Sequence, residues 1–159
     1  MKKSGFTLLE IIIAVFILTV AIVGSFALIQ KSIVSASQAQ FRLTAAYLIQ
    51  EGTEIVRNIR DTNWLASGAN WDDNIFCCGG SLCECEADYN DLALVSGDRY
   101  LKTDGGFYNY DSGSDTKFKR KITVEKISEN QLKVTCKVEW EEKGRTNSIE
   151  ALEYLYNWK

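Results

Sequence analysis

The chain has 159 residues, and its 18 Lys and Arg against 21 Asp and Glu give a formal net charge of −3 at pH 7. This acidic balance, without a basic patch interleaved with aromatic residues, argues against nucleic acid as a primary partner. The sequence contains no His, which removes the commonest general base and the commonest zinc ligand. The length supports one globular domain plus an N-terminal anchor.

A single carboxylate interrupts the apolar N-terminal stretch. A short basic head containing Lys2 and Lys3 ends at Gly5, and the only charge between Gly5 and Lys31 is Glu10. A charged side chain at the bilayer centre costs roughly 2.5–3.5 kcal/mol, so a membrane helix seldom carries one without a partner. Pairing with a buried ammonium recovers much of that cost and can set the register between neighbouring subunits. The alternative is an ordinary signal anchor with a stray acid.

The apolar stretch is predicted to stay in the mature protein. As a helix, Ile11–Ile29 would be about 28 Å long, close to the ~30 Å hydrocarbon core of a bilayer. A cleaved secretory signal has its apolar core before the cleavage site, whereas here the core follows Gly5. The positive-inside rule keeps Lys2 and Lys3 in the cytoplasm, which predicts a single span with the C-terminal bulk exported.

These residues resemble the N-terminus of type IV prepilins: a basic leader ending in Gly5, then Phe6, then Glu10 at the fifth place after the junction. The resemblance implies that a prepilin peptidase cuts between Gly5 and Phe6 and that the new amino group of Phe6 is N-methylated. It also implies that Glu10 neutralises the amino terminus of a neighbouring subunit during filament assembly. The sequence departs from many type IV pilins in having no helix-kinking Pro.

The helix is expected to run from Phe6 to about Arg60, because nothing beyond Lys31 breaks the backbone. Apolar or small residues recur there at steps of four and three, which is typical of one face of an α-helix: Phe41, Ala45, Leu48, Gly52, Ile55 and Ile59. We expect the globular domain to pack on this stripe. Arg57 and Asp61 are expected to pair on the other side of the helix.

A β-rich region should follow the helix. Turn-forming residues and scattered aromatics from Ser67 to Asp115 indicate a long connection with at most short strands. Three strands joined by turns at 128–130 and 143–147 are then predicted: Lys119–Ile127, Leu132–Glu141 and Ser148–Trp158. The fold class is therefore α+β, with a long N-terminal α-helix packed on a C-terminal antiparallel β-sheet. This layout is similar to the heads of minor pilins and of type II secretion pseudopilins.

Five cysteines, Cys77, Cys78, Cys83, Cys85 and Cys136, need an account. The first four form a tight run, and exported segments meet oxidising conditions, so disulfides within this loop are the first interpretation. Four cysteines allow three pairings, and the pairing of adjacent Cys77 and Cys78 is disfavoured by ring strain. A zinc site with the same four thiolates is the alternative, although the run lacks two C-x₂₋₄-C arms. Cys136 is expected to be a small buried hydrophobe or to tie the loop to the sheet.

Two acid-rich turns, Asp88–Asp91 and Asp111–Asp115, could hold Ca²⁺. They lack the oxygen spacing of an EF-hand loop, which favours solvated loops. Nothing places the carboxylate pairs Asp72–Asp73 and Glu84–Glu86 in a pocket. We therefore expect no catalytic site and no cofactor.

The sequence predicts a non-enzymatic structural subunit, a minor pilin, of a type IV pilus or related filament. Its expected parts are a leader (1–5), a transmembrane and filament-core helix (6–30), an amphipathic continuation (31–61) and a head with the cysteine loop and a three-stranded meander (62–159). The resemblance implies other pilin or pseudopilin subunits, prepilin peptidase, an inner-membrane assembly platform and the membrane as partners. It places the chain in the inner (cytoplasmic) membrane with its head exported, and then in a cell-surface or periplasmic filament. Two alternatives stay open: a pseudopilin of a type II secretion or DNA-uptake machine, and a membrane-anchored surface-binding module.

Overall fold

The computed structural model describes the chain except residues 1–4, 6, 79–82 and 159. The chain divides into two compact units, an N-terminal unit (Met1–Phe41) and a C-terminal unit (Arg42–Lys159). One helix, α1 (Leu8–Leu65), accounts for nearly all of the first unit and continues into the second. The predicted α+β fold class, with a long N-terminal helix and antiparallel sheets, is confirmed.

Helix α1 is continuous through Gly24 and ends five residues later than Arg60, the expected end. The N–H of Ala66 donates to the carbonyl of Thr62, and Gly68 has a φ of 84°. A glycine with positive φ just after a helix ends it without the steric cost of a side chain. This helix end therefore follows from local glycine chemistry.

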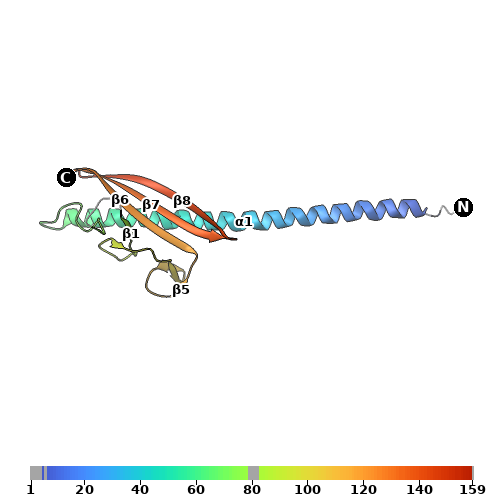
Figure 1. The fold of residues 1–159 in the computed structure, drawn as a ribbon, viewed down its shortest axis with the longest axis horizontal. Helices are drawn as coiled ribbons and strands as arrows, with labels where there is room; N and C mark the ends of the chain where they lie inside the picture. The colour runs from blue at the N-terminus through green and yellow to red at the C-terminus, as the bar shows by residue number, and fades with distance from the viewer. Residues whose placement is uncertain (1–4, 6, 79–82, 159) are drawn as a thin grey trace. The chain divides into compact units, whose positions relative to one another are not determined.

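The main sheet of the C-terminal unit is antiparallel and has the strand order β2-β1-β6-β7-β8. Its centre is the predicted meander of three long strands: β6 (Phe118–Ser128), β7 (Gln131–Glu142) and β8 (Arg145–Tyr156). Figure 1 shows these strands crossing the green C-terminal turns of α1.

The turn between β7 and β8 is shorter than predicted. It consists of Lys143 and Gly144, whose φ angles are 52° and 73°. Positive φ at both central residues is the signature of a two-residue type I′ hairpin turn, which matches the twist of the flanking strands. The prediction of a five-residue turn was wrong, because β8 begins at Arg145 rather than Ser148.

Short strands complete the unit. They are β1 (Glu84–Glu86) and β2 (Val95–Ser96), which extend the meander on the β6 side. A separate small sheet has the order β4-β3-β5 and is built from β3 (Lys102–Asp104), β4 (Phe107–Asn109) and β5 (Ser114–Asp115). In its described residues (66–78 and 83–117), the region between α1 and β6 therefore has only short strands, as the sequence predicts.

The core of the C-terminal unit lies between α1 and the meander. The helix buries the predicted stripe, with Phe41 only half-buried at its start; the buried residues are Ala45, Leu48, Ile49, Gly52, Ile55, Val56, Ile59 and Asn63. Alternate residues of β7 bury the opposing face: Leu132, Val134, Cys136, Val138 and Trp140. Buried side chains recur about every 3.6 residues on the helix and every 2 residues on the strand, and the two sets pack against each other in one apolar layer.

A buried guanidinium holds three parts of this core together. Arg120 of β6 is 1% exposed, and its Nη1 and Nη2 donate to the carbonyls of Leu48 (3.2 Å) and Ala87 (2.7 Å). Its Nη1 also lies 3.4 Å from a carboxylate oxygen of Glu51. The Glu51 side chain is 33% exposed, so the two backbone carbonyls are the buried partners of the guanidinium. Leaving a buried charged donor without its acceptor costs more than ~1–3 kcal/mol, so Arg120 fixes the segment after β1 against α1 and β6.

Charge pairing on the helix differs from the prediction. Arg57 does not pair with Asp61: its Nε donates to Glu153 of β8 at 2.7 Å, and Nη1 contacts Glu54. Asp61 instead accepts from Arg60 Nε at 2.8 Å. Arg57 has turned towards the sheet, because a carboxylate on a strand packed against the helix competes with one on the helix surface.

Candidate functional site

The start of α1 is capped by a residue that the sequence analysis did not single out. The side-chain oxygen of Thr7 accepts a hydrogen bond from the N–H of Glu10 at 3.3 Å. The carbonyl of Thr7 accepts from the N–H groups of Glu10 (3.1 Å) and Ile11 (3.3 Å). Thr7 is therefore the N-cap, and Thr-x-x-Glu is the sequence signature of a capping box. That signature is visible in the sequence and could have identified Thr7.

Glu10 lies in the first turn of α1 with its side chain exposed. An acidic residue there also interacts favourably with the positive end of the helix dipole. Among the described residues, the Glu10 carboxylate makes no ion pair within the chain. The first described basic residue after it, Lys31, is 21 positions further on, about 32 Å along a helix. Within the described residues, the Glu10 carboxylate therefore has no counter-charge from its own chain.

The predicted processing junction is only partly described. Gly5 is exposed and lies outside α1, three residues before its start. Phe6, the predicted first residue of the mature chain and N-methylation site, lies outside the described residues. The described part of the junction is therefore an exposed, non-helical glycine two positions before the capping residue Thr7.

The N-terminal unit exposes apolar side chains on every side of α1. The apolar part of the helix is long enough to cross a bilayer, and none of it is buried. The hydroxyls of Thr19 and Ser25 donate to the carbonyls four residues earlier, at 2.7 and 2.8 Å, so these polar groups need no water. By length and composition the segment could cross a membrane, and a helix apolar all round requires cover.

The cysteine loop contains two nested disulfides. Cys77 is bonded to Cys85 and Cys78 to Cys83, one of the three pairings that the sequence left open. The Cys77–Cys85 disulfide links the loop to the main sheet, because Cys85 is the central residue of β1 and pairs with Ile122 of β6. Oxidised sulfurs are not thiolate ligands, which removes the basis of the zinc alternative. In the described part of the chain, no three His, Cys, Asp or Glu side chains are arranged to hold a metal ion.

Cys136 has a different environment from the cysteine loop. It is a free, buried thiol on the helix-facing side of β7. Burial raises the pKa of this thiol to about 12. It behaves as the small hydrophobe that the sequence analysis expected, and the alternative tie between loop and sheet is not formed.

Comparisons with known proteins identify the N-terminus. Residues 1–26 match the family described as the prokaryotic N-terminal methylation motif, which is the type IV prepilin signature. No curated protein and no solved structure matches the chain. The match covers the leader, the junction, Glu10 and the start of the apolar segment, and it supports a subunit like those of pilins or pseudopilins.

Proposed function

We propose that this chain is a structural subunit, of the minor-pilin kind, of a type IV pilus or related filament. The observation that carries the proposal is the methylation motif at residues 1–26, with a capped helix starting directly behind its junction. A prepilin peptidase would cut between Gly5 and Phe6, and the new amino group of Phe6 would be methylated. The chain would then act through assembly and not through catalysis.

The physical argument concerns cover for the apolar helix. Its exposed side chains need lipid around them before assembly and the helices of other subunits afterwards. The C-terminal unit has its own core, so it can stay folded outside the membrane or on the filament surface while the apolar N-terminal half of α1 is covered. Cleavage would create an amino group, and Glu10 would supply its counter-charge on a neighbouring subunit.

The first experiment tests processing. The full chain is co-expressed with a prepilin peptidase, and the mature N-terminus is sequenced and weighed. We expect N-methylated Phe6, heavier by about 14 Da than the unmethylated cleaved chain. A Gly5→Lys variant should remain uncut. A protein that still begins at Met1 in the presence of active peptidase would contradict the proposal.

The second experiment separates the two roles open to Glu10. Glu10→Gln keeps a side chain that suits the capping box but loses the charge, whereas Thr7→Ala loses the cap, at ~1 kcal/mol, and keeps the charge. We expect Glu10→Gln to be processed normally and to be depleted at least tenfold from sheared filaments, and Thr7→Ala to enter them. Normal incorporation of Glu10→Gln would show that the carboxylate has no assembly role.

A further inference from the structure

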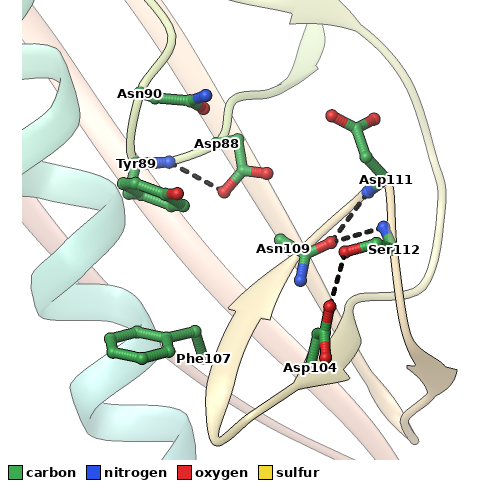
Figure 2. A pocket seen from close by; sticks show the side chains of 8 residues that line it. All are labelled: Asp88, Tyr89, Asn90, Asp104, Phe107, Asn109, Asp111 and Ser112. Carbon is green, nitrogen blue, oxygen red and sulfur yellow. Dashed lines mark hydrogen bonds between the residues drawn. The ribbon is translucent and has the colours of Figure 1, made fainter.

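The two acid-rich turns of the sequence meet at one pocket in the C-terminal unit. The pocket has a volume of about 270 Å³ and is lined by Asp88, Tyr89 and Asn90 on one side and by residues of the small sheet on the other. Figure 2 shows these side chains around a shared hollow. Pockets with a few convergent polar groups are the usual sites for small ligands.

One buried side chain at this pocket has a polar group without a partner. Asn109 is 8% exposed, and its Oδ1 accepts the N–H groups of Asp111 (2.9 Å) and Ser112 (2.7 Å). Only an oxygen can accept both, so the amide orientation is fixed and Nδ2 is a donor. Nδ2 makes no hydrogen bond within the described chain, and in Figure 2 it points to the side where Phe107 and Asp104 lie. Nδ2 is therefore a donor on the pocket wall that an acceptor oxygen of a ligand could take over from water.

The same pocket offers acceptors. Asp104 and Asp111 are exposed, and within the described residues the Asp111 carboxylate accepts no hydrogen bond. Asp104 uses one oxygen for the hydroxyl of Ser112 at 3.0 Å. By contrast, the buried Asp88 is committed to the backbone N–H groups of Tyr89 and Tyr110. Asp104 and Asp111 can therefore receive hydroxyl protons from a ligand, while Asp88 shapes the pocket.

Two aromatic side chains border these polar groups. Tyr89 is 64% exposed and Phe107 is 74% exposed. Large aromatic faces left in water beside a polar pocket indicate a ligand with an apolar face. A lysine or arginine side chain would use the carboxylates, but neither has an acceptor for Asn109 Nδ2–H. A metal ion would likewise be opposed by that donor and would not need the aromatic rings.

We propose that this pocket binds a saccharide. A sugar ring combines an apolar face of C–H groups with edge hydroxyls that both donate and accept. In this arrangement the ring lies against Phe107, one of its hydroxyls donates to Asp104, and one of its oxygens accepts from Asn109 Nδ2. The inference goes beyond the filament role and does not depend on it.

The test uses the full chain in amine-oxide micelles, because sugar-headed detergents would compete. Saturation-transfer difference NMR measures the binding of four ligands, the methyl glycosides of glucose, galactose, mannose and N-acetylglucosamine. We expect at least one to bind, and Phe107→Ala and Asn109→Asp each to weaken it about tenfold, which corresponds to ~1.4 kcal/mol. Asn109→Asp keeps the acceptor for the two backbone N–H groups, so the turn should stay folded, which circular dichroism checks.

The matched control is Tyr47→Ala, because Tyr47 of α1 is 63% exposed, as open as Tyr89. It should leave the affinity unchanged, and loss of binding there would overturn the assignment of the pocket. Absence of signal for all four glycosides would overturn the proposal. The proposal would also be overturned if Phe107→Ala and Asn109→Asp bound the glycoside as tightly as the wild-type chain does. Binding of Ca²⁺ or lysine amide at these residues, without binding of any glycoside, would overturn it as well.

Discussion

Replacing Gly52 by Ala tests how closely α1 approaches the sheet. A Cβ at this position would lie 2.6 Å from Sγ of Cys136 and 3.0 Å from Cδ of Arg120. In an open helix the change would stabilise by ~1 kcal/mol through helix propensity. Here both neighbours are buried, and overpacking costs typically ~1–3 kcal/mol. The net of these two effects is a loss of up to about 2 kcal/mol, so we expect Gly52→Ala to lower the free energy of unfolding instead of raising it.

A double-mutant cycle with Cys136→Ala isolates the steric cause. Alone, Cys136→Ala should cost about 1 kcal/mol for the small cavity it leaves. In the double variant the new methyl group occupies the space of the missing sulfur, so the two costs should fall short of additivity by at least ~1 kcal/mol. Denaturation of the full chain in micelles, followed by near-UV circular dichroism of Trp71 and Trp140, gives the four values. Stabilisation by Gly52→Ala, or additive costs, would refute the reasoning.

Three further predictions concern the same unit. Because burial raises the pKa of Cys136 to about 12, iodoacetamide should label it only after unfolding without reductant, and rapid labelling of the native chain would contradict this. The hydrogen bond from Lys137 lowers the pKa of Glu139 below its usual 4.5. The stability that the ionised Glu139 contributes is therefore fully present above pH 4.5 and is lost as the pH falls through the lowered pKa. Glu139→Gln should flatten the acid-side decline of the urea midpoint, and parallel decline in both proteins would show that the pair is not responsible. Opening both disulfides of the cysteine loop with reductant should cost at least ~2–3 kcal/mol while amide-exchange protection of β7 persists, and an unchanged denaturation midpoint would count against it.

The long elements of the fold were predictable because burial on one face imposes a period on the sequence. The steps of four and three after Phe41 gave the buried face of α1, and the alternation from Leu132 to Trp140 gave β7. Both patterns are local, so a single sequence contains them in full. The extra sheet strands were not predictable in this way. The pairing of Cys85 with Ile122 joins residues 37 positions apart, and three-residue strands carry no period of their own.

The candidate sites show the same division. Glu10 was identified because a lone carboxylate is conspicuous in an apolar stretch, and Thr7 was missed although its capping spacing to Glu10 is local. The buried Arg120 lies at an inward position of β6, but the carbonyls that satisfy it come from α1 and from the segment after β1. The pocket at Asn109 depends on two turns that only the tertiary structure brings together.

The path of β8 determines where a label or affinity tag can be attached to the chain. Trp64 and Trp158 meet edge to face with their ring centroids 4.6 Å apart, and Trp64 Nε1 donates to Asn157 at 3.4 Å. Asn157 and Trp158 therefore lie beside the last turn of α1, 23 positions and about 35 Å along the helix from Arg42. A fluorophore or affinity tag attached at Trp158 would therefore lie at that end of the C-terminal unit. If the proposed cleavage after Gly5 takes place, a tag at the N-terminus would be removed with the leader, whereas one at Trp158 would be kept.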